Sequence, residues 1–377
     1  MKVALVTTQP APYRIPVWDA VASRVGTLGV YLCTDREPNR IWDVMNPDGY
    51  RFTCIYPQGL SVHVRRHEFD LHVNPSLPRL LSRLEPDAVV VTGYQTPSFV
   101  AVIAWARARK IPLVLWWESH AGSSRVQRGP IAVARKRLIH CADAYVTVGQ
   151  RSAAYLVELG VPPERISRGV NAVDVERLRR SQANGHVDRD DDRVKFLYVG
   201  QLIERKGVQD LLAAFEAMPR DTTWLRIVGY GPLEDELRDA VRRKRLHNVE
   251  FAAGTKTLEE TAAHYSWADF LVMPSRVEVW GLVVNEALAC GLPVLASRQA
   301  GCTPDLVECA PICVGLTFDA GSIQDIGRAI QEAVTRNREF DRGRIAEWGR
   351  RFTPGSLAAS ICTAVEAAVT NRAPTAP

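Results

Sequence analysis

The chain has 377 residues, of which 46% are hydrophobic and 24% charged, and its formal net charge is +5. This balance is typical of a globular enzyme and excludes a disordered chain, and the length favours two domains of comparable size. The charge is uneven, since residues 1–170 hold 21 lysines and arginines against 13 aspartates and glutamates, a net of +8 against −3 for the remainder. We expect the basic half to meet phosphates or an anionic membrane surface, or to be a solvated face, and we expect no nucleic acid partner.

The lengths of the apolar runs indicate where in the cell the protein is found. No run approaches the length of about 20 residues that a helix needs to cross a bilayer. The opening stretch, "MKVALVTTQPAPYR", contains an apolar run that is too short for a signal peptide, and it predicts a buried first strand. We therefore expect a cytoplasmic protein, either free or peripheral at the inner face of the membrane.

In the first half of the chain, short β-branched runs alternate with helical stretches. This rhythm is typical of a parallel sheet covered by helices on both faces. It predicts a first Rossmann-like domain over 1–180. The expected strands are 2–8, 28–34, 87–93, 111–118 and 144–149, and the expected helices are 14–25, 74–84, 97–110 and 150–159.

A polar stretch, "SQANGHVDRDDDR" (181–193), has no hydrophobic period and is interpreted as a linker. A second Rossmann-like domain follows at 194–349, and a final helix at about 350–370 is expected to cross back to the first domain. The predicted class is α/β, with two doubly wound domains facing a central cleft. In the second domain the expected strands are 194–200, 223–229, 249–254, 269–275 and 292–297, and the expected helices are 207–218, 233–245, 257–266, 281–289 and 322–335.

The turns after the strands of the second domain carry candidate ligand-binding residues. Arg205 and Lys206 precede Gly207 at the entrance of a helix, where unpaired amides and two cations suit a phosphate. The alternative is an ordinary surface pair of cations. The glycine-rich turn 229–232 either allows a ligand to approach the backbone or is only a tight turn.

Two glutamates bracket an apolar turn in "SRVEVWGLVVNEALACGLP" (275–293). Glu278 stands in a short loop after a strand, and Glu286 lies one and a half turns into a helix that begins at Gly281. Glu286 is placed to accept hydrogen bonds from a pair of hydroxyls, and the amides of Gly281, Leu282 and Val283 suit an anion. Alternatively, Glu278 is a solvated loop residue and Glu286 lies on the polar face of an amphipathic helix.

Taken together, these pieces resemble the retaining family-4 glycosyltransferases of the GT-B fold, the glycosyltransferase group 1 enzymes with an E-x7-E motif. The resemblance is strongest over 194–307, in "YVGQLIERKGVQDLLAAF", "IVGYGPLEDEL", "ADFLVMPSRVEVWGLVVNEALACGLPVLAS" and "AGCTPDLV". In the first half, "APYR", "ADAYVTVGQRSAAYLVELGVPPERI" and "NAVD" are also similar to the family. Four linked motifs at family-like spacing are a specific signal.

The resemblance implies a hexosyl-type transferase that uses a nucleotide diphosphate sugar, with the acceptor bound by the domain at 1–180 and the donor by the domain at 194–349. Arg205 and Lys206 would neutralise the diphosphate, Glu278 would bind the sugar near the anomeric centre, and Glu286 would hold the ribose. Cations and amides at the leaving group assist its departure, because negative charge develops there. Phosphate and sugar oxygens would meet the amides of Gly281, Leu282 and Val283, and the nucleobase would be flanked by Gly229, Tyr230, Gly231, Thr255 and Lys256.

Three positions depart from the family pattern. Gln201 stands where the family commonly has arginine, and the first loop, "TTQPAPYR" (7–14), lacks the frequent glycine pair. We expect Pro12, Tyr13 and Arg14 to meet the acceptor or a phosphate. After the strand "IPLVLWWE" the family often has a histidine that contacts the donor sugar; here either His120, as a catalytic residue, or Glu118 would take that place.

The remaining expectations concern metal, membrane and alternative activities. The Asp-x-Asp pattern of 188–193 lies in a polar linker and follows no strand, so no essential metal and no cofactor are expected. The segment 130–139 sets Arg135, Lys136 and Arg137 beside apolar residues, which suits either an anionic membrane or packing on its own domain.

The acceptor would be a glycan, a lipid-linked carrier or a small metabolite in glycan or glycoconjugate biosynthesis. Alternative functions are a sugar phosphorylase or epimerase-like enzyme on the same fold, and a non-catalytic nucleotide-sugar binding protein.

Overall fold

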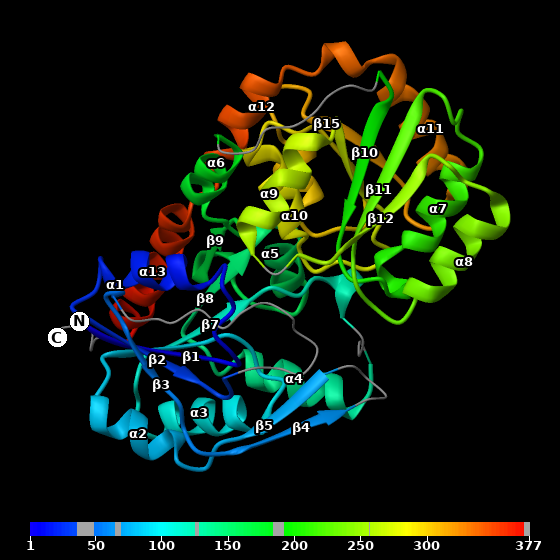
Figure 1. Cartoon of the computed structure of the whole chain (residues 1–377). Helices are drawn as coiled ribbons and strands as arrows, with labels where there is room; N and C mark the ends of the chain where they lie inside the picture. The colour runs from blue at the N-terminus through cyan, green and yellow to red at the C-terminus, as the bar shows by residue number, and fades with distance from the viewer. Residues whose placement is uncertain (36–48, 65–68, 125–127, 184–191, 256, 373–377) are drawn as a thin grey trace. The chain divides into compact units, whose positions relative to one another are not determined.

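The computed structural model describes residues 1–35, 49–64, 69–124, 128–183, 192–255 and 257–372. They form two compact units, Met1–Ala172 with Pro354–Pro377, and Val173–Thr353. Each unit is built around one parallel sheet with helices packed on it (Figure 1). Two doubly wound α/β units confirm the predicted fold class.

The first unit contains a seven-stranded sheet in the order β3-β2-β1-β6-β7-β8-β9, and every pair in it is parallel. The order reverses between β1 and β6, so the loops after these two strands are where a ligand is expected. Its strands are β1 (Lys2–Thr7), β2 (Thr27–Leu32), β3 (Thr53–Ile55), β6 (Ala88–Val91), β7 (Leu113–Trp117), β8 (Ala144–Val148) and β9 (Ile166–Gly169), and a separate hairpin is made of β4 (Leu60–Val64) and β5 (Phe69–Val73). Its helices are α1 (Ile15–Ala22), α2 (Leu77–Leu84), α3 (Pro97–Ala108), α4 (Pro130–Ile139), α5 (Gly149–Glu158) and α13 (Pro354–Thr370).

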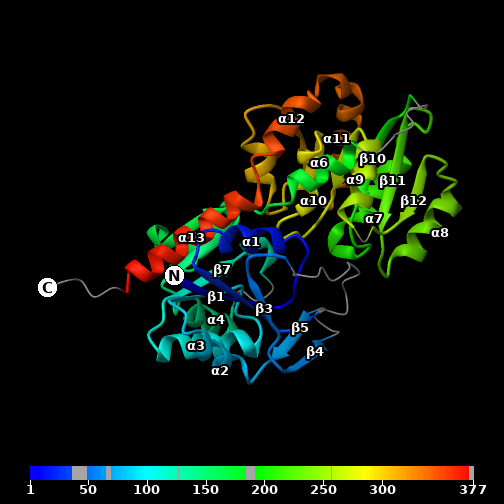
Figure 2. The same ribbon diagram turned by 60° about the vertical axis from the view of Figure 1, so that its left-hand side comes forward.

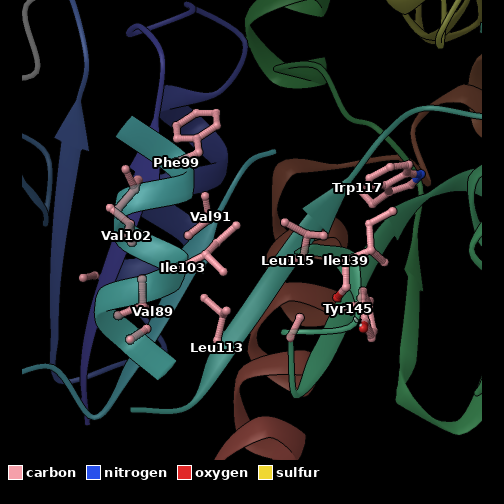
Figure 3. Packing of buried hydrophobic residues seen from close by; sticks show 14 of the residues in the cluster. Val89, Val91, Phe99, Val102, Ile103, Leu113, Leu115, Trp117, Ile139 and Tyr145 are labelled. Atoms are coloured by element: carbon pink, nitrogen blue, oxygen red, sulfur yellow. Dashed lines mark hydrogen bonds between the residues drawn. The ribbon is translucent and has the colours of Figure 1, made fainter. Parts of the chain in front are cut away.

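The core of this unit shows why the strands are nearly continuous apolar runs. Both faces of the sheet are covered at its centre, so successive side chains of β6, β7 and β8 are all buried. On one face, Phe99, Val102 and Ile103 of α3 point onto residues of β6 and β7 such as Val91 and Leu113 (Figure 3). Burying a side chain of this size contributes about 1.5–3 kcal/mol, so this layer is a main source of the stability of the unit.

The last helix, α13, belongs to the first unit. It lies beside α1 (Figures 1 and 2), and Arg24 Nη1 donates a hydrogen bond to the carbonyl of Gly355 at 2.7 Å. The stretch Arg342–Thr370 is long and apolar enough by composition to span a membrane. It is divided into two helices, however, and Leu357 and Ile361 of α13 are fully buried, as in the core helix of a globular unit.

The second unit contains a six-stranded parallel sheet in the order β12-β11-β10-β13-β14-β15. Here the order reverses between β10 and β13, where Phe196 pairs with Phe270. Its strands are β10 (Val194–Val199), β11 (Thr223–Gly229), β12 (Val249–Ala253), β13 (Phe270–Met273), β14 (Val294–Ser297) and β15 (Gly315–Phe318). Its helices are α6 (Val175–Ala183), α7 (Val208–Glu216), α8 (Glu234–Lys244), α9 (Leu258–Trp267), α10 (Leu282–Ala289), α11 (Ile323–Thr335) and α12 (Arg342–Gly349).

The boundary between the units differs from the predicted end of the first domain at 180. Helix α6 packs on α9 and α10, and Arg177 forms an ion pair with Glu259, so the chain joins the second unit from Val173 onwards. Residues 184–191 of the predicted linker lie outside the described residues. The predicted last helix begins at Pro354 because proline at the first helical position has no amide to satisfy.

The hairpin β4–β5 turns its polar face inward. Ser61 faces His72 across the two strands, and His72 is buried, whereas Leu60, Val62 and Val73 are exposed. The backbone amide of His72 bonds Thr96 Oγ1 at 3.3 Å, which ties the hairpin to the start of α3. Polar contacts with α3 therefore decide which face of the hairpin is buried.

Candidate active site

In the second unit, the loops after β10 and β13 carry the predicted residues Arg205, Lys206 and Glu278. A 3-10 turn, Glu204–Lys206, follows β10, and Glu278 follows β13. The carbonyl of Arg205 accepts hydrogen bonds from the backbone amides of Arg276 at 2.9 Å and Val277 at 3.2 Å. These bonds hold the cationic turn against the loop of Glu278, at the point where the strand order reverses.

Glu278 forms an ion pair with Lys206. Only 8% of Glu278 is exposed, and Ser275 Oγ donates a hydrogen bond to the same carboxylate at 3.3 Å. Burial tends to raise the pKa of Glu278, but the charges of Lys206 and Arg205 and the hydrogen bonds outweigh burial and lower that pKa below its ordinary value. Glu278 is therefore ionised at neutral pH, and Lys206 balances its charge.

Asp210 and Arg276 support this arrangement, although neither was predicted as a site residue. Arg276 Nε and Nη2 donate to the two carboxylate oxygens of Asp210 at 2.7 and 2.6 Å, and Asp210 on α7 is buried. Arg276 also gives its backbone amide to Arg205. A bidentate pair of this kind fixes orientation as well as position, so the pair ties the loop of Glu278 to the helix that follows the cationic turn.

Helix α10 begins at Leu282, one residue after the predicted start, with Gly281 as its N-cap. Gly281 has φ +105°, and a Cβ there would lie 2.6 Å from Met273 Sδ, so only glycine fits. Trp280 Nε1 donates to Asn285 Oδ1 at 2.7 Å, and both side chains are buried. The first amides of an α-helix, here those of Leu282 and Val283, have no intrahelical acceptor, so this helix entrance suits an anion.

Glu286 lies on α10 and is partly buried. Tyr265 on α9, only 1% exposed, donates its hydroxyl to Glu286 Oε2 at 2.5 Å. Burial raises the pKa of Glu286 to about 7, while the hydrogen bond from Tyr265 opposes the increase. The role of Tyr265 was not predicted, because an aromatic residue on the buried face of a helix has the same pattern as any core residue.

The predicted nucleobase residues lie at the same edge of this sheet. A Cβ on Gly229 would collide with the carbonyl of Gly200, so the loops after β10 and β11 pack backbone to backbone. The carbonyl of Tyr230 accepts a hydrogen bond from the amide of Leu202 at 2.7 Å, and Gly231 lies against the same leucine. Thr255 is hydrogen-bonded to Thr261 at 2.6 Å, and Lys256 lies outside the described residues.

In the first unit, Arg14 at the end of the loop after β1 pairs with Glu118 at the end of β7. The Arg14 guanidinium also lies 4.3 Å from the ring centre of Trp116 and 5.1 Å from that of Tyr13. Arg14 Nη1 is buried, and among the described residues it has no hydrogen-bond partner. The structure thus brings two predicted acceptor-site residues together, but the charge of Arg14 is already matched by a carboxylate. Pro12 is half-buried in the same loop.

His120 is 3% exposed and caps the 3-10 turn Ala121–Ser123. Its backbone amide donates a hydrogen bond to Ser123 Oγ at 2.9 Å, and the same hydroxyl donates to the His120 carbonyl at 3.0 Å. Glu118 keeps 32% of its side chain exposed, and its carbonyl accepts a hydrogen bond from Ser152. Of the two alternatives for the sugar-contacting position, Glu118 is the more accessible and His120 is engaged in local structure.

Two other features considered in the sequence are the basic helix α4 and the metal-binding capacity of the chain. On α4, Arg135 is buried and donates to Ser124 Oγ at 2.6 Å, whereas Lys136 and Arg137 are exposed. Within the described ranges, no group of three or more His, Cys, Asp or Glu side chains is arranged to hold a metal ion. Most of the Asp-x-Asp pattern, 188–191, falls outside those ranges.

Comparison with family models accounts for most of the chain. Residues 181–351 match the model described as glycosyl transferases group 1, and residues 18–169 match a glycosyl transferase 4-like domain. An uncharacterized glycosyltransferase of Methanocaldococcus jannaschii is 29% identical over 42% of this chain and 42% of its own length. The glycogen synthase of Mycobacterium tuberculosis is 29% identical over 63% of this chain, and the match spans 60% of that enzyme.

Solved structures share the fold over nearly the whole chain. The Anabaena protein Alr3699/HepE, solved in complex with UDP, has a TM-score of 0.71 and 16% identity, and the match covers 97% of this chain and 100% of that one. The sucrose-phosphate synthase of Thermosynechococcus elongatus has a TM-score of 0.73 and 19% identity, with 96% and 98% of the two chains covered. At this level of identity the likeness establishes the fold.

Proposed function

The chain belongs to the group 1 glycosyltransferases of family-4 type with the GT-B fold, and we propose that it transfers a hexose-type sugar from a nucleoside diphosphate sugar to an acceptor hydroxyl, with retention of anomeric configuration. The observation that carries the proposal is the contact of Lys206 with the buried Glu278, beside Arg205, at the reversal point of the second sheet. A cation suited to a diphosphate, Lys206, is thus hydrogen-bonded to a carboxylate suited to a sugar, Glu278.

The proposed chemistry follows from the charge that develops when the glycosyl phosphate bond breaks. Negative charge grows on the leaving diphosphate, where Arg205, Lys206 and the first amides of α10 would stabilise it. Positive charge grows on the oxocarbenium-like sugar, which the ionised Glu278 would face. Because Lys206 and Glu278 are paired with each other, we expect the donor diphosphate to displace the Glu278 carboxylate from the ammonium group of Lys206 and so make that carboxylate available to the sugar.

Glu286 would hold the ribose of the donor through hydrogen bonds from its two vicinal hydroxyls. The ionised carboxylate offers one acceptor oxygen to each hydroxyl and accepts more strongly, whereas a protonated carboxyl uses one of its oxygens as a donor. The first unit would bind the acceptor, a glycan, a lipid-linked carrier or a small metabolite, through the loop of Pro12, Tyr13 and Arg14. We further propose a cytoplasmic enzyme that works without metal, either free or peripheral at the inner face of the membrane.

A thermal-shift screen of nucleoside diphosphates tests the donor site before any acceptor is known. A ligand at about 100 times its Kd stabilises the folded state by about 2.7 kcal/mol, which corresponds to a rise in Tm of about 5–10 °C for a unit of this size. The active donor then comes from incubating the matching nucleotide sugars with candidate acceptors and following release of the diphosphate. NMR of the product gives its anomeric configuration, and an inverted product would contradict retention.

Glu278→Gln provides the matched control for the screen. This variant keeps the size of the side chain and removes the charge, so it should still show the thermal shift with the nucleoside diphosphate but lose transfer. If no nucleoside diphosphate or nucleotide sugar shifts the melting temperature of the wild type, the proposed function is wrong.

A further inference from the structure

An open cavity of about 500 Å³ lies in the first unit, at the carboxyl end of β2. Its walls come from the residues that follow β2 and from those that lead into β4 of the hairpin. The polar and aromatic residues that line it are Thr34, Asp35, Tyr56, Gln58 and Ser61. The volume is within the range of small-molecule sites, about 300–1,000 Å³.

The walls of this cavity are fixed by buried hydrogen bonds. Asn74, which is 4% exposed, donates from its side-chain amide to the carbonyl of Cys33 at 3.1 Å and to that of Pro57 at 2.9 Å, and so joins the two walls. Ser61 Oγ is hydrogen-bonded to the buried His72 Nδ1 at 2.8 Å. A cavity whose walls are already ordered loses little entropy when a ligand binds.

The cavity also adjoins the loop after β1 that carries the predicted acceptor residues. The amide of Thr34 donates to the carbonyl of Thr8 at 2.9 Å, and the amide of Cys33 donates to that of Thr7 at 3.0 Å. Thr7 and Thr8 begin the loop that ends at Arg14. The cavity and the Arg14–Glu118 pair therefore lie along the same edge of one sheet, the edge where α/β folds bind ligands.

The chemistry of the lining favours an uncharged, hydroxyl-rich ligand. Tyr56 is 46% exposed, and neither its hydroxyl nor the side-chain amide of Gln58 has a partner among the residues that the structure describes. The lining residues that the structure describes include no lysine or arginine, and Asp35 among them supplies a carboxylate that repels phosphate. An exposed aromatic face attracts polarised C–H groups, and the amide and carboxylate bind hydroxyls, which together fit a sugar ring.

We infer that this cavity is the acceptor subsite and that it binds an uncharged saccharide ring, stacked on Tyr56 with its hydroxyls on Asp35 and Gln58. The inference rests on the proposed glycosyltransferase function and adds to it the class of acceptor. An acceptor carried on a lipid would thus be recognised by its sugar and not by its phosphate.

Saturation-transfer NMR tests the inference with methyl glycosides of common neutral hexoses at millimolar concentration, and with hexose phosphates as the competing class. We expect signals from at least one neutral glycoside in the wild type and their loss in Tyr56→Ala. Tyr50→Ala is the control, because it removes a ring of the same size that stacks on Phe52 and does not line the cavity. Once an acceptor is known, Tyr56→Ala and Gln58→Ala should each raise its KM about tenfold and leave the donor Kd unchanged.

Three results would overturn the inference: no signal from any neutral glycoside, stronger binding of hexose phosphates, or signals that survive Tyr56→Ala. The donor screen with nucleoside diphosphates separates this failure from failure of the proposed function. A wild-type protein that binds a nucleoside diphosphate but shows no Tyr56-dependent glycoside binding remains a candidate glycosyltransferase whose acceptor site lies elsewhere.

Discussion

Replacing Tyr265 with phenylalanine removes a single hydroxyl that hydrogen-bonds Glu286 and leaves the buried ring in place. Burial raises the pKa of Glu286 to about 7, and the Tyr265 hydrogen bond holds it from rising further. A hydrogen bond to a charged group contributes about 1.5–3 kcal/mol, and one pKa unit corresponds to about 1.4 kcal/mol. We therefore expect Glu286 in Tyr265→Phe to ionise about 1–2 pH units higher than in the wild type.

The measurement is the Kd of the nucleoside diphosphate by calorimetry between pH 6 and pH 9.5. If the ionised Glu286 holds the ribose, wild-type affinity should increase as pH rises through about 7, the pKa of this carboxyl. The variant should bind about 5- to 50-fold more weakly at pH 7 and recover at high pH, since fewer molecules carry the ionised carboxylate at neutral pH. Tyr145→Phe is the control, because it removes a buried hydroxyl bonded to the Ile139 carbonyl in the first unit.

The same carboxyl affects stability with a definite sign. Its pKa in the folded state lies above the ordinary value of 4.5, so folding binds a proton between these values, and the free energy of unfolding falls as pH rises from about 4.5 to about 7. If the pH midpoint of nucleoside diphosphate binding is the same in Tyr265→Phe as in the wild type, the proposed link between Tyr265 and Glu286 is wrong. Donor affinity that decreases with rising pH would refute ribose binding by the carboxylate.

Three further predictions concern the second unit and its chemistry. Lys206→Ala leaves the buried Glu278 charge uncompensated and should cost about 3 kcal/mol, seen as a Tm lower by about 6–12 °C, and adding Glu278→Gln should restore much of that loss. Arg276→Ala breaks the bidentate pair with Asp210 and should lower kcat about tenfold or more with a smaller change in donor Kd, measured by steady-state kinetics and calorimetry. Full activity in excess EDTA is expected, and abolition by EDTA that added metal reverses would contradict a metal-free mechanism.

Much of the fold could be predicted because its strands are buried on both faces. Such strands are continuous apolar runs, and "KFLYV", "FLVM" and "AVVV" are visible without any knowledge of tertiary contacts. Their order along the chain, with helices between, also places the loops that carry Arg205, Lys206 and Glu278 after strands of the second domain. What local sequence patterns could not show is that β10 and β13 are neighbours, because Lys206 and Glu278 in the loops that follow them are 72 positions apart.

The hairpin β4–β5 illustrates a different limit. Residues 53–73 carry no predicted element, although 60–64 and 69–73 alternate between apolar and polar side chains as half-buried strands do. The usual interpretation of such alternation buries the apolar face, whereas here His72 is buried and Leu60 is exposed. The reversal depends on hydrogen bonds to the carbonyl of His72 on β5 from Thr96, the N-cap of α3, and from Ser98 in the first turn of that helix, which local sequence does not reveal.

The pairing of oppositely charged site residues with each other is a feature that their charges could have suggested, but each residue was considered separately and the pairs were not predicted. Arg14, Lys206, Glu118 and Glu278 were each selected for a contact with a substrate, yet the structure joins them into two ion pairs, one in each unit. A cation or carboxylate removed from water is costly unless an opposite charge lies beside it, so site residues of opposite sign are expected to neutralise each other. A diphosphate that binds Lys206 must therefore compete with Glu278 for the same ammonium group. The carboxylate freed by that competition would be available for the sugar hydroxyls, which is why the pair, and neither residue alone, is the unit to test.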